Sequence, residues 1–160
     1  VKDSEIISKD GTTPYIAAIS TKNGITGYSA YPANNKGDCI TLSTTADSSA
    51  TVFYQQNPFI GRQQMAGLYK KDKTPMGLNL GLFFVSSIKK VLNNYNYTNK
   101  LTIPALKQSY ISLPIQQVLD PDKTYHPEGY IPDWDYMEAF MKQINQQAQA
   151  KLDTLEKGNI

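Results

Sequence analysis

The feature that most limits how this chain can fold is its closing segment, which predicts one long helix. Asp133 stands at an N-cap position, and Pro132 and Met137 occupy the hydrophobic-staple positions around it. The helix can run over 133–157, which is roughly 36 Å, and Gly158 supplies a C-terminal stop. We therefore expect a helix that projects from the rest of the chain.

The apolar residues of this helix recur at steps of three and four, and the residues between them are mostly Gln, Asn, Lys and Glu. Such a narrow stripe suits one partner helix better than a broad core face. We therefore expect the helix to pair with a second helix through Met137, Met141, Ile144, Ala148, Leu152 and Leu155. The alternative is that its outer half folds back on the preceding domain.

The residues before this helix predict a β-rich body. Short runs of strand-forming residues alternate with turn formers, and they place strands at 14–19, 25–30, 39–43, 50–56, 65–70 and 109–115. Asn23 and Gly24 predict a tight turn, since both residues tolerate positive φ.

The apolar period changes to a helical one over 74–94. Thr74 would be the N-cap of this helix and Pro75 its first residue. Its first half is apolar nearly all round, so we expect it to be buried. The predicted fold class is a mixed α/β (α+β) fold with a recognition body over 1–116, a polar connector over 117–132 and the projecting helix over 133–158.

Charge is divided unevenly along the chain. Residues 50–116 hold eight Lys or Arg and one acid, a net charge of +7, whereas 117–160 hold four Lys and eight acids, a net charge of −4. A basic globular body attracts polyanions, and nucleic acid is the commonest one inside cells. The alternative is a solvated basic face without a partner.

The sequence offers little for catalysis, metal binding or membrane insertion. The longest apolar run, 80–88, is too short to cross a membrane. One histidine, His126, and one cysteine, Cys39, make a zinc site implausible, and a Ser-His-Asp triad would depend on the proline-flanked His126. The run at 56–59 is similar to the Asn-Pro-Pro-Tyr/Phe loop of amino-methyltransferases but lacks its second proline. We expect a binding module, and the lone Cys39 fits a cytoplasmic location.

If the partner is DNA, the loop 55–64 is the best candidate for reading it. Base edges are read by Arg, Asn, Gln and Lys, phosphates are bound by Lys and Arg, and Arg62 is the only arginine of the chain. Segments 21–24 and 95–100 come next, and the lysines of 70–73 suit phosphates. The candidate DNA-binding residues are Lys22, Asn23, Gln55, Gln56, Asn57, Arg62, Gln63, Gln64, Lys70, Lys71, Lys73, Tyr97, Asn99 and Lys100. The alternative for the loop is a polar, solvent-exposed hairpin.

Four stretches, in this order, resemble the target recognition domain of type I restriction-modification specificity subunits and of related fused restriction–methylation enzymes. They are "TPYIAAISTKNGITGYS" (13–29), "NKGDCITLSTTADSSATVFYQQNPFIG" (35–61), "LNLGLFFVSSIKKVLNNYNYTNKLTIPALKQSYISLPI" (78–115) and "GYIPDWDYMEAFMKQI" (129–144). They look like the family's early strand and Asn-Gly turn, its Gly-Asp strand and aromatic strand, its buried helix with the last strand, and the start of its spacer helix.

The resemblance implies a non-catalytic module that reads one half of a bipartite double-stranded DNA target. It implies methyltransferase and restriction subunits as partners, and S-adenosylmethionine as the cofactor of the methyltransferase subunits, with none bound by this chain. The long helix would be a spacer that pairs with a second recognition half or a second copy. The alternative function is a protein-interaction or substrate-recognition module with no DNA role.

A full specificity subunit carries two such domains and two helices, whereas this chain has one of each and begins at Val1. We therefore expect half of a subunit, a half-length protein that dimerises, or the tail of a fused enzyme.

Overall fold

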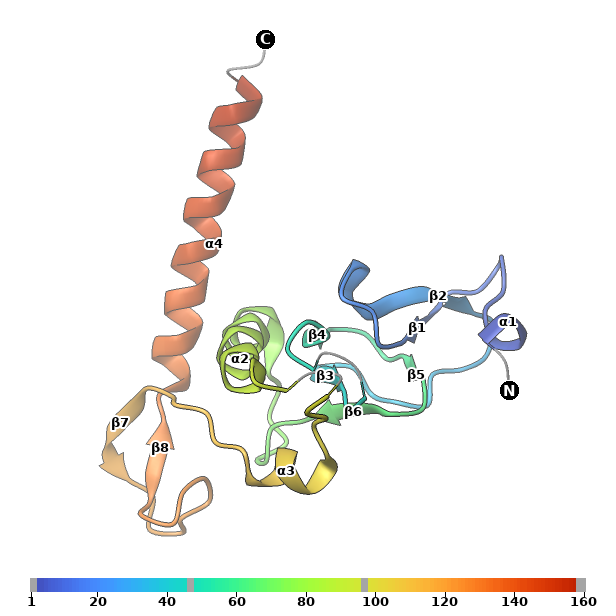
Figure 1. The fold of residues 1–160 in the computed structure, drawn as a ribbon. Helices are drawn as coiled ribbons and strands as arrows, with labels where there is room; N and C mark the ends of the chain where they lie inside the picture. Colours follow the sequence, from blue (N-terminus) through green and yellow to red (C-terminus); the bar gives the residue numbers. More distant parts are fainter. Residues whose placement is uncertain (1–2, 46–47, 96–97, 158–160) are drawn as a thin grey trace. The chain divides into compact units, whose positions relative to one another are not determined.

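The computed structural model describes residues 3–45, 48–95 and 98–157, and the chain divides into two compact units, Val1–Ser112 and Leu113–Ile160 (Figure 1). Both helices and strands are present, so the predicted mixed α+β class is confirmed. No helix in the described part of the chain is long and apolar enough to cross a membrane.

The first unit holds two three-stranded sheets and the helix α2. Its elements are α1 (Asp3–Ile6), β1 (Thr13–Ile16), the 3-10 turn η1 (Lys22–Gly24), β2 (Ile25–Ser29), β3 (Cys39–Ser43), β4 (Phe53–Gln55), β5 (Ile60–Gly61), β6 (Met65–Leu68), α2 (Gly77–Leu92) and α3 (Ile103–Gln108). One sheet has the order β2-β1-β5 and the other β4-β3-β6. The β1–β5 pair is parallel and the other pairs are antiparallel.

The core of the first unit forms around β3 and α2. Every residue of β3 is buried, as expected for the central strand of a sheet that a helix covers. In α2 the buried side chains recur every four residues, at Leu80, Phe84, Ile88 and Leu92, so they line one face, which packs on β3 and β4 (Figure 1). A Cβ added at Gly81 would lie 2.4 Å from a ring carbon of Tyr54 on β4, so only glycine allows this approach of helix and strand.

Most predicted strands of the first unit are confirmed, in particular 39–43 and 25–30. The tight turn is confirmed as well: Asn23 has φ 54° and Gly24 has φ 77°. The predicted strand at 109–115 is wrong, because residues 109–114 form no strand and only Ile115 belongs to one. The short helix α3 was not predicted, although the Thr102 side chain that accepts a hydrogen bond from Ala105 N is an ordinary helix-start signal.

The predicted start of the buried helix is also wrong. α2 begins at Gly77, and the Thr74 hydroxyl donates to Asp72 Oδ1 at 2.8 Å instead of capping the helix. The cap comes from a distant residue: the Asp38 carboxylate accepts from Met76 N at 2.7 Å and Gly77 N at 2.9 Å. A carboxylate at a helix N-terminus satisfies free N–H groups and complements the helix dipole.

The second unit consists of β7 (Ile115–Leu119), β8 (Tyr130–Pro132) and α4 (Trp134–Lys157). β7 and β8 form an antiparallel hairpin, so the segment predicted as a connector contains two strands that were not foreseen. The turn between them is held by Asp120, whose carboxylate accepts from Asp122 N and Thr124 N. These backbone contacts make the hairpin an ordered element.

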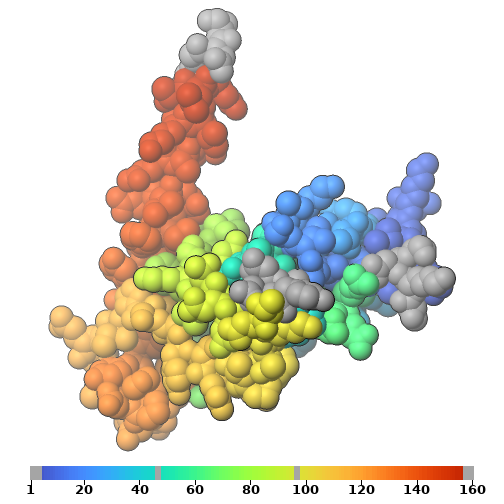
Figure 2. Space-filling model, viewed as in Figure 1, coloured from blue at the N-terminus to red at the C-terminus, as the bar shows by residue number. Residues whose placement is uncertain are grey.

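The long helix α4 is confirmed over the predicted range. Asp133 Oδ1 accepts from Tyr136 N at 3.0 Å, the bond expected of an N-cap residue. The predicted stop at Gly158 lies outside the described residues. The side chains of α4 beyond Asn145 stand on the surface of the unit as far as Glu156 (Figure 2).

Candidate nucleic-acid interface

The predicted recognition loop joins β4 to β6 and is held in place at its middle. Phe59 is buried beside Ile16 and Cys39, and β5 lies parallel to β1. Arg62 N donates to Ile16 O at 2.8 Å, which extends this pairing by one residue. The anchored backbone presents exposed polar side chains on both sides of β5, namely Gln56, Asn57, Arg62, Gln63 and Gln64.

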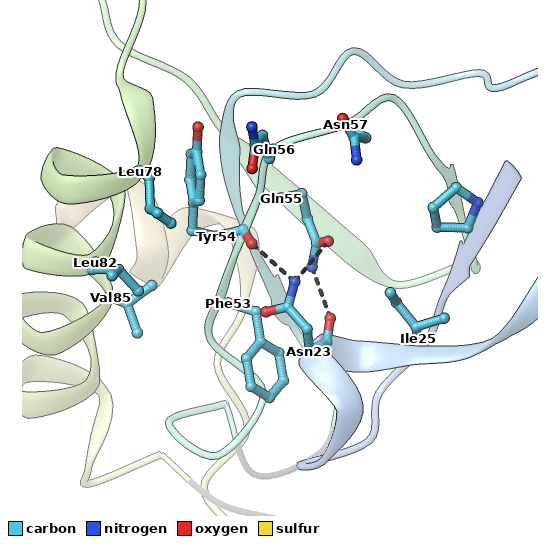
Figure 3. Close-up of a pocket in the computed structure, with 11 residues that line it drawn as sticks. Asn23, Ile25, Phe53, Tyr54, Gln55, Gln56, Asn57, Leu78, Leu82 and Val85 are labelled. Carbon is cyan, nitrogen blue, oxygen red and sulfur yellow. Dashed lines mark hydrogen bonds between the residues drawn. The ribbon is translucent and has the colours of Figure 1, made fainter. Parts of the chain in front are cut away.

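One predicted DNA reader, Gln55, is a structural residue. Its side chain is 4% exposed, and its amide nitrogen donates to Asn23 O at 2.9 Å and Thr41 Oγ1 at 3.0 Å. Asn23 Nδ2 donates in return to Gln55 Oε1 at 3.2 Å and to Tyr54 O at 3.0 Å (Figure 3). A buried amide with these partners joins η1 to β4 and has no free edge to offer a base.

A pocket of about 330 Å³ opens where η1, β4 and α2 meet (Figure 3). Its polar lining is made of four amides, those of Asn23, Gln55, Gln56 and Asn57. Its apolar lining comes from Pro14, Ile25, Phe53, Tyr54, Leu78, Leu82 and Val85. The chain thus brings two predicted segments, 21–24 and 55–57, together in one hollow.

The amides of Gln56 and Asn57 differ from those of Gln55 and Asn23. Both residues are exposed, and within the described structure their side-chain amides make no hydrogen bond. Each offers a carbonyl acceptor and an NH₂ donor to a ligand. The polar edge of the pocket therefore combines two fixed amides with two available ones.

The apolar wall of the pocket was missed by sequence reasoning. Leu78, Leu82 and Val85 follow each other at helical spacing on a face of α2 different from the buried one, and Leu78 is 52% exposed. The signal was present in the sequence, because a helix that is apolar nearly all round has more than one apolar face.

Asp38 fixes this wall relative to β4. The Tyr54 hydroxyl donates to Asp38 Oδ1 at 2.8 Å, while the same carboxylate holds the first turn of α2. Burial opposes ionisation of Asp38, but the hydrogen bonds from Met76 N, Tyr54 and Gly77 N outweigh it and lower the pKa of its carboxyl. Burial, together with the contact to Asp38, raises the pKa of Tyr54, so the Asp38 carboxyl is ionised and the Tyr54 hydroxyl is neutral.

The predicted phosphate anchors are not equivalent. The Lys70 side chain is 8% exposed and lies 3.6 Å from Asp72 Oδ2, whereas Lys71 and Lys73 are exposed. Lys22 is exposed next to the pocket residue Asn23. A further lysine, Lys89, places its Nζ 5.3 Å from the centroid of the Phe53 ring and was not predicted.

Of the candidates near 95–100, the described residues Asn99 and Lys100 do not line the pocket. Asn99 Nδ2 donates to Asn94 O at 3.0 Å, and Lys100 is exposed. Tyr97 lies outside the described residues.

Neither the cysteine of the chain nor any described acid lines this pocket. Cys39 is fully buried, and burial raises the pKa of its thiol, which keeps it protonated. No cluster of three or more His, Cys, Asp or Glu in the described segments could hold a metal ion.

The exposure of the predicted pairing stripe increases along α4, from its first residue to its last. Met137 is fully buried and Met141 partly so, but Ile144 is 42%, Leu152 53% and Leu155 65% exposed. Ala148 is also exposed. Sequence reasoning missed a neighbouring aromatic pair, Tyr136 and Phe140, whose exposed rings stack at 6.1 Å one helical turn apart.

Comparison with known proteins gives two matches. A family model described as "Type I restriction modification DNA specificity domain" matches residues 2–156. Among solved structures, the chain is similar to the S subunit of a type I restriction-modification system from M. genitalium, at 16% sequence identity and a TM-score of 0.49. The similarity covers 98% of this chain and 38% of that subunit. No curated protein sequence matches.

Proposed function

This chain belongs to the family of type I restriction-modification DNA specificity domains, and from that premise we propose that it reads one half of a bipartite double-stranded DNA target. The observation that carries the proposal is the anchored loop 56–64, which exposes three glutamines, one asparagine and the only arginine of the chain. These are the side chains that fork onto base edges in the major groove.

The charge of the body supports the same function. Residues 50–116 carry a net charge of +7, and Lys71, Lys73 and Lys22 are exposed on the unit that holds the loop. Phosphate contacts from such lysines supply affinity and register, while the loop supplies sequence preference. The comparisons give no support to the alternative of a protein-interaction module without a DNA role.

The chain is not itself the enzyme in this proposal. Methyltransferase subunits that use S-adenosylmethionine would modify the DNA, restriction subunits would cut it, and this chain would bind neither metal nor cofactor of its own. The chain spans 38% of the length of the S subunit it resembles. α4 would pair with the equivalent helix of a second recognition half or of a second copy, through the stripe from Met137 to Leu155.

Arg62→Ala tests the reading role. A fork of Arg62 onto guanine predicts a loss on the order of 1–3 kcal/mol at one base position, with nonspecific affinity nearly unchanged. A competition titration with a randomised site, performed on the assembled complex, measures both quantities for wild type and variant.

Lys90→Ala is the matched control, because Lys90 is an exposed cation on α2 outside the loop. Its loss should weaken all sequences alike or have no effect. An unchanged base preference in Arg62→Ala would remove Arg62 from the reading surface.

A further inference from the structure

The pocket between η1, β4 and α2 has a shape that an intact DNA groove does not require. Grooves are themselves concave, and they are read by elements that project into them, such as a helix or a two-stranded ribbon. A hollow of about 330 Å³ receives a convex ligand instead. Gln55, which lines this hollow, is 4% exposed and could not reach the edge of a paired base.

The lining of the pocket matches one class of convex ligand. A nucleobase outside a base stack is flat, has hydrogen-bonding edges and needs apolar surfaces against its faces. The pocket lining combines the free amides of Gln56 and Asn57 with the apolar side chains Leu78, Leu82 and Val85 of α2 and with the Phe53 ring (Figure 3). Amides complement base edges because each carries both a donor and an acceptor.

The charges around the pocket suit the phosphate of a nucleotide. Lys22 precedes the pocket residue Asn23 and is exposed, and Lys89 stacks over the Phe53 ring that lines the pocket. None of the eleven lining residues is acidic. The nearby carboxylate of Asp38 is engaged by Tyr54 and by two backbone N–H groups of α2.

We propose that this pocket binds a single unstacked nucleobase that carries a phosphate. The inference rests on the proposed function for its main source, an unpaired or extruded base of DNA, and a free mononucleotide is the other source with the same chemistry. Gln56 and Asn57 bind the edge of the base, while the α2 wall and Phe53 cover its faces. The pocket thus acts beside the reading loop as a second, shape-selective part of the DNA interface.

The test compares two DNA duplexes of the same sequence with the full chain. In one, an extra adenine analogue, 2-aminopurine, is unpaired and bulged, and in the other it is absent. The bulged duplex should bind about tenfold tighter or more. Its fluorescence should change on binding, as the base moves from solvent into the pocket. Adenosine 5′-monophosphate is added as competitor in a third arm.

Leu82→Trp fills the pocket from the α2 side without changing any residue of the loop, and it should abolish the preference for the bulge. The double variant Gln56→Ala/Asn57→Ala changes only exposed side chains and gives a second probe if the tryptophan is not tolerated. Lys90→Ala is the control, since Lys90 is exposed on the same helix as Leu82 but does not line the pocket. It should keep the preference.

Competition by the mononucleotide would identify a free nucleotide as a ligand, and a pocket-dependent bulge preference without competition would identify DNA as the source. Equal binding of the two duplexes by wild type, or a preference that survives Leu82→Trp and the double variant, would overturn the pocket assignment alone. If the wild-type chain shows no salt-dependent binding to either duplex, that result would instead overturn the proposed function. The two failures are therefore separable.

Discussion

Asp38 connects three separate parts of the first unit through the hydrogen bonds of its carboxylate. It accepts from the backbone of Met76 and Gly77 and from the hydroxyl of Tyr54, so one side chain joins the loop before β3, the start of α2 and β4. Its position could not be predicted from local sequence, because the cap and the helix are 38 residues apart.

We predict that Asp38→Ala destabilises the first unit by about 1–3 kcal/mol, the cost of a lost helix cap and of donors left unpaired. Because folding lowers the pKa of Asp38, its contribution is present above the ordinary value of 3.8 and is lost as the pH falls through the lower folded value. Denaturant unfolding of wild type and variant at a series of pH values measures this. The difference in free energy of unfolding between wild type and Asp38→Ala should become smaller below about pH 4.

Asp72→Ala serves as the control for Asp38, because its bonds go to Thr74 and Lys70 within one surface turn. Asp72→Ala should lower the free energy of unfolding by less than Asp38→Ala does. A gap between wild type and Asp38→Ala that stays constant down to the acid limit would contradict the assigned pKa.

The lysines of the β6–α2 turn allow a second comparison at the residue scale. Lys71 is exposed, whereas the Lys70 side chain is 8% exposed and paired with Asp72. Lys71→Ala should weaken binding to all DNA sequences and make the salt slope shallower by about one. Lys70→Ala should change the slope less. Equal slopes for wild type and Lys71→Ala, measured by titration at several salt concentrations, would exclude a phosphate contact of Lys71.

At the scale of elements, patterns in neighbouring residues predicted the main strand and helix of the first unit but failed at 109–114 and at Thr74, and features set by distant contacts were not predicted. The strand-forming run Cys39–Ser43 and the helical period of Gly77–Leu92 are local, and both elements form, although the helix begins at Gly77 and not at the predicted Thr74 cap. Gln55 and its neighbour Gln56 are the same residue type, yet one is buried among Asn23 and Thr41 and the other is exposed. Only the tertiary fold decides which glutamine is available to a ligand.

α4 illustrates the same distinction. Its range and its Asp133 cap follow from local signals, but the gradient from the buried Met137 to the exposed Leu155 does not, because every residue of the stripe is apolar alike. The exposed outer part of the stripe, at Ile144, Leu152 and Leu155, is the part that remains available for a second helix.

We predict that Ile144→Asp weakens association through α4 while leaving the helix folded, because Ile144 is already 42% exposed and a charge there would face the apolar seam of a partner. Sedimentation over a range of concentrations and assembly of the complex are the measurements. Gln146→Asp introduces the same charge at an exposed position outside the stripe and should assemble normally. The pairing role would be wrong if wild type stays monomeric at high concentration and Ile144→Asp enters the complex as readily.

At the scale of the whole molecule, the division of charge parallels the division of structure. The basic segment 50–116 lies almost wholly within the first unit, while the acidic residues of 117–160 belong to the second. DNA attracts the basic segment 50–116 and repels the acidic residues of 117–160. We therefore expect the first unit alone to make phosphate contacts. A helix that mediates protein pairing has no need of a basic surface.

We predict that the chain binds DNA with a slope of log affinity against log salt of roughly −4 to −5, as for about four to six neutralised phosphates. Neutralising the exposed acids Asp153 and Glu156 of α4 should leave this slope unchanged, because residues that touch no phosphate release no counterions. Affinity itself should rise only slightly, since charges beyond about 8 Å are screened at physiological salt. A steeper slope in the neutralised variant would show that α4 approaches the DNA, and binding independent of salt in wild type would remove DNA as the partner of this chain.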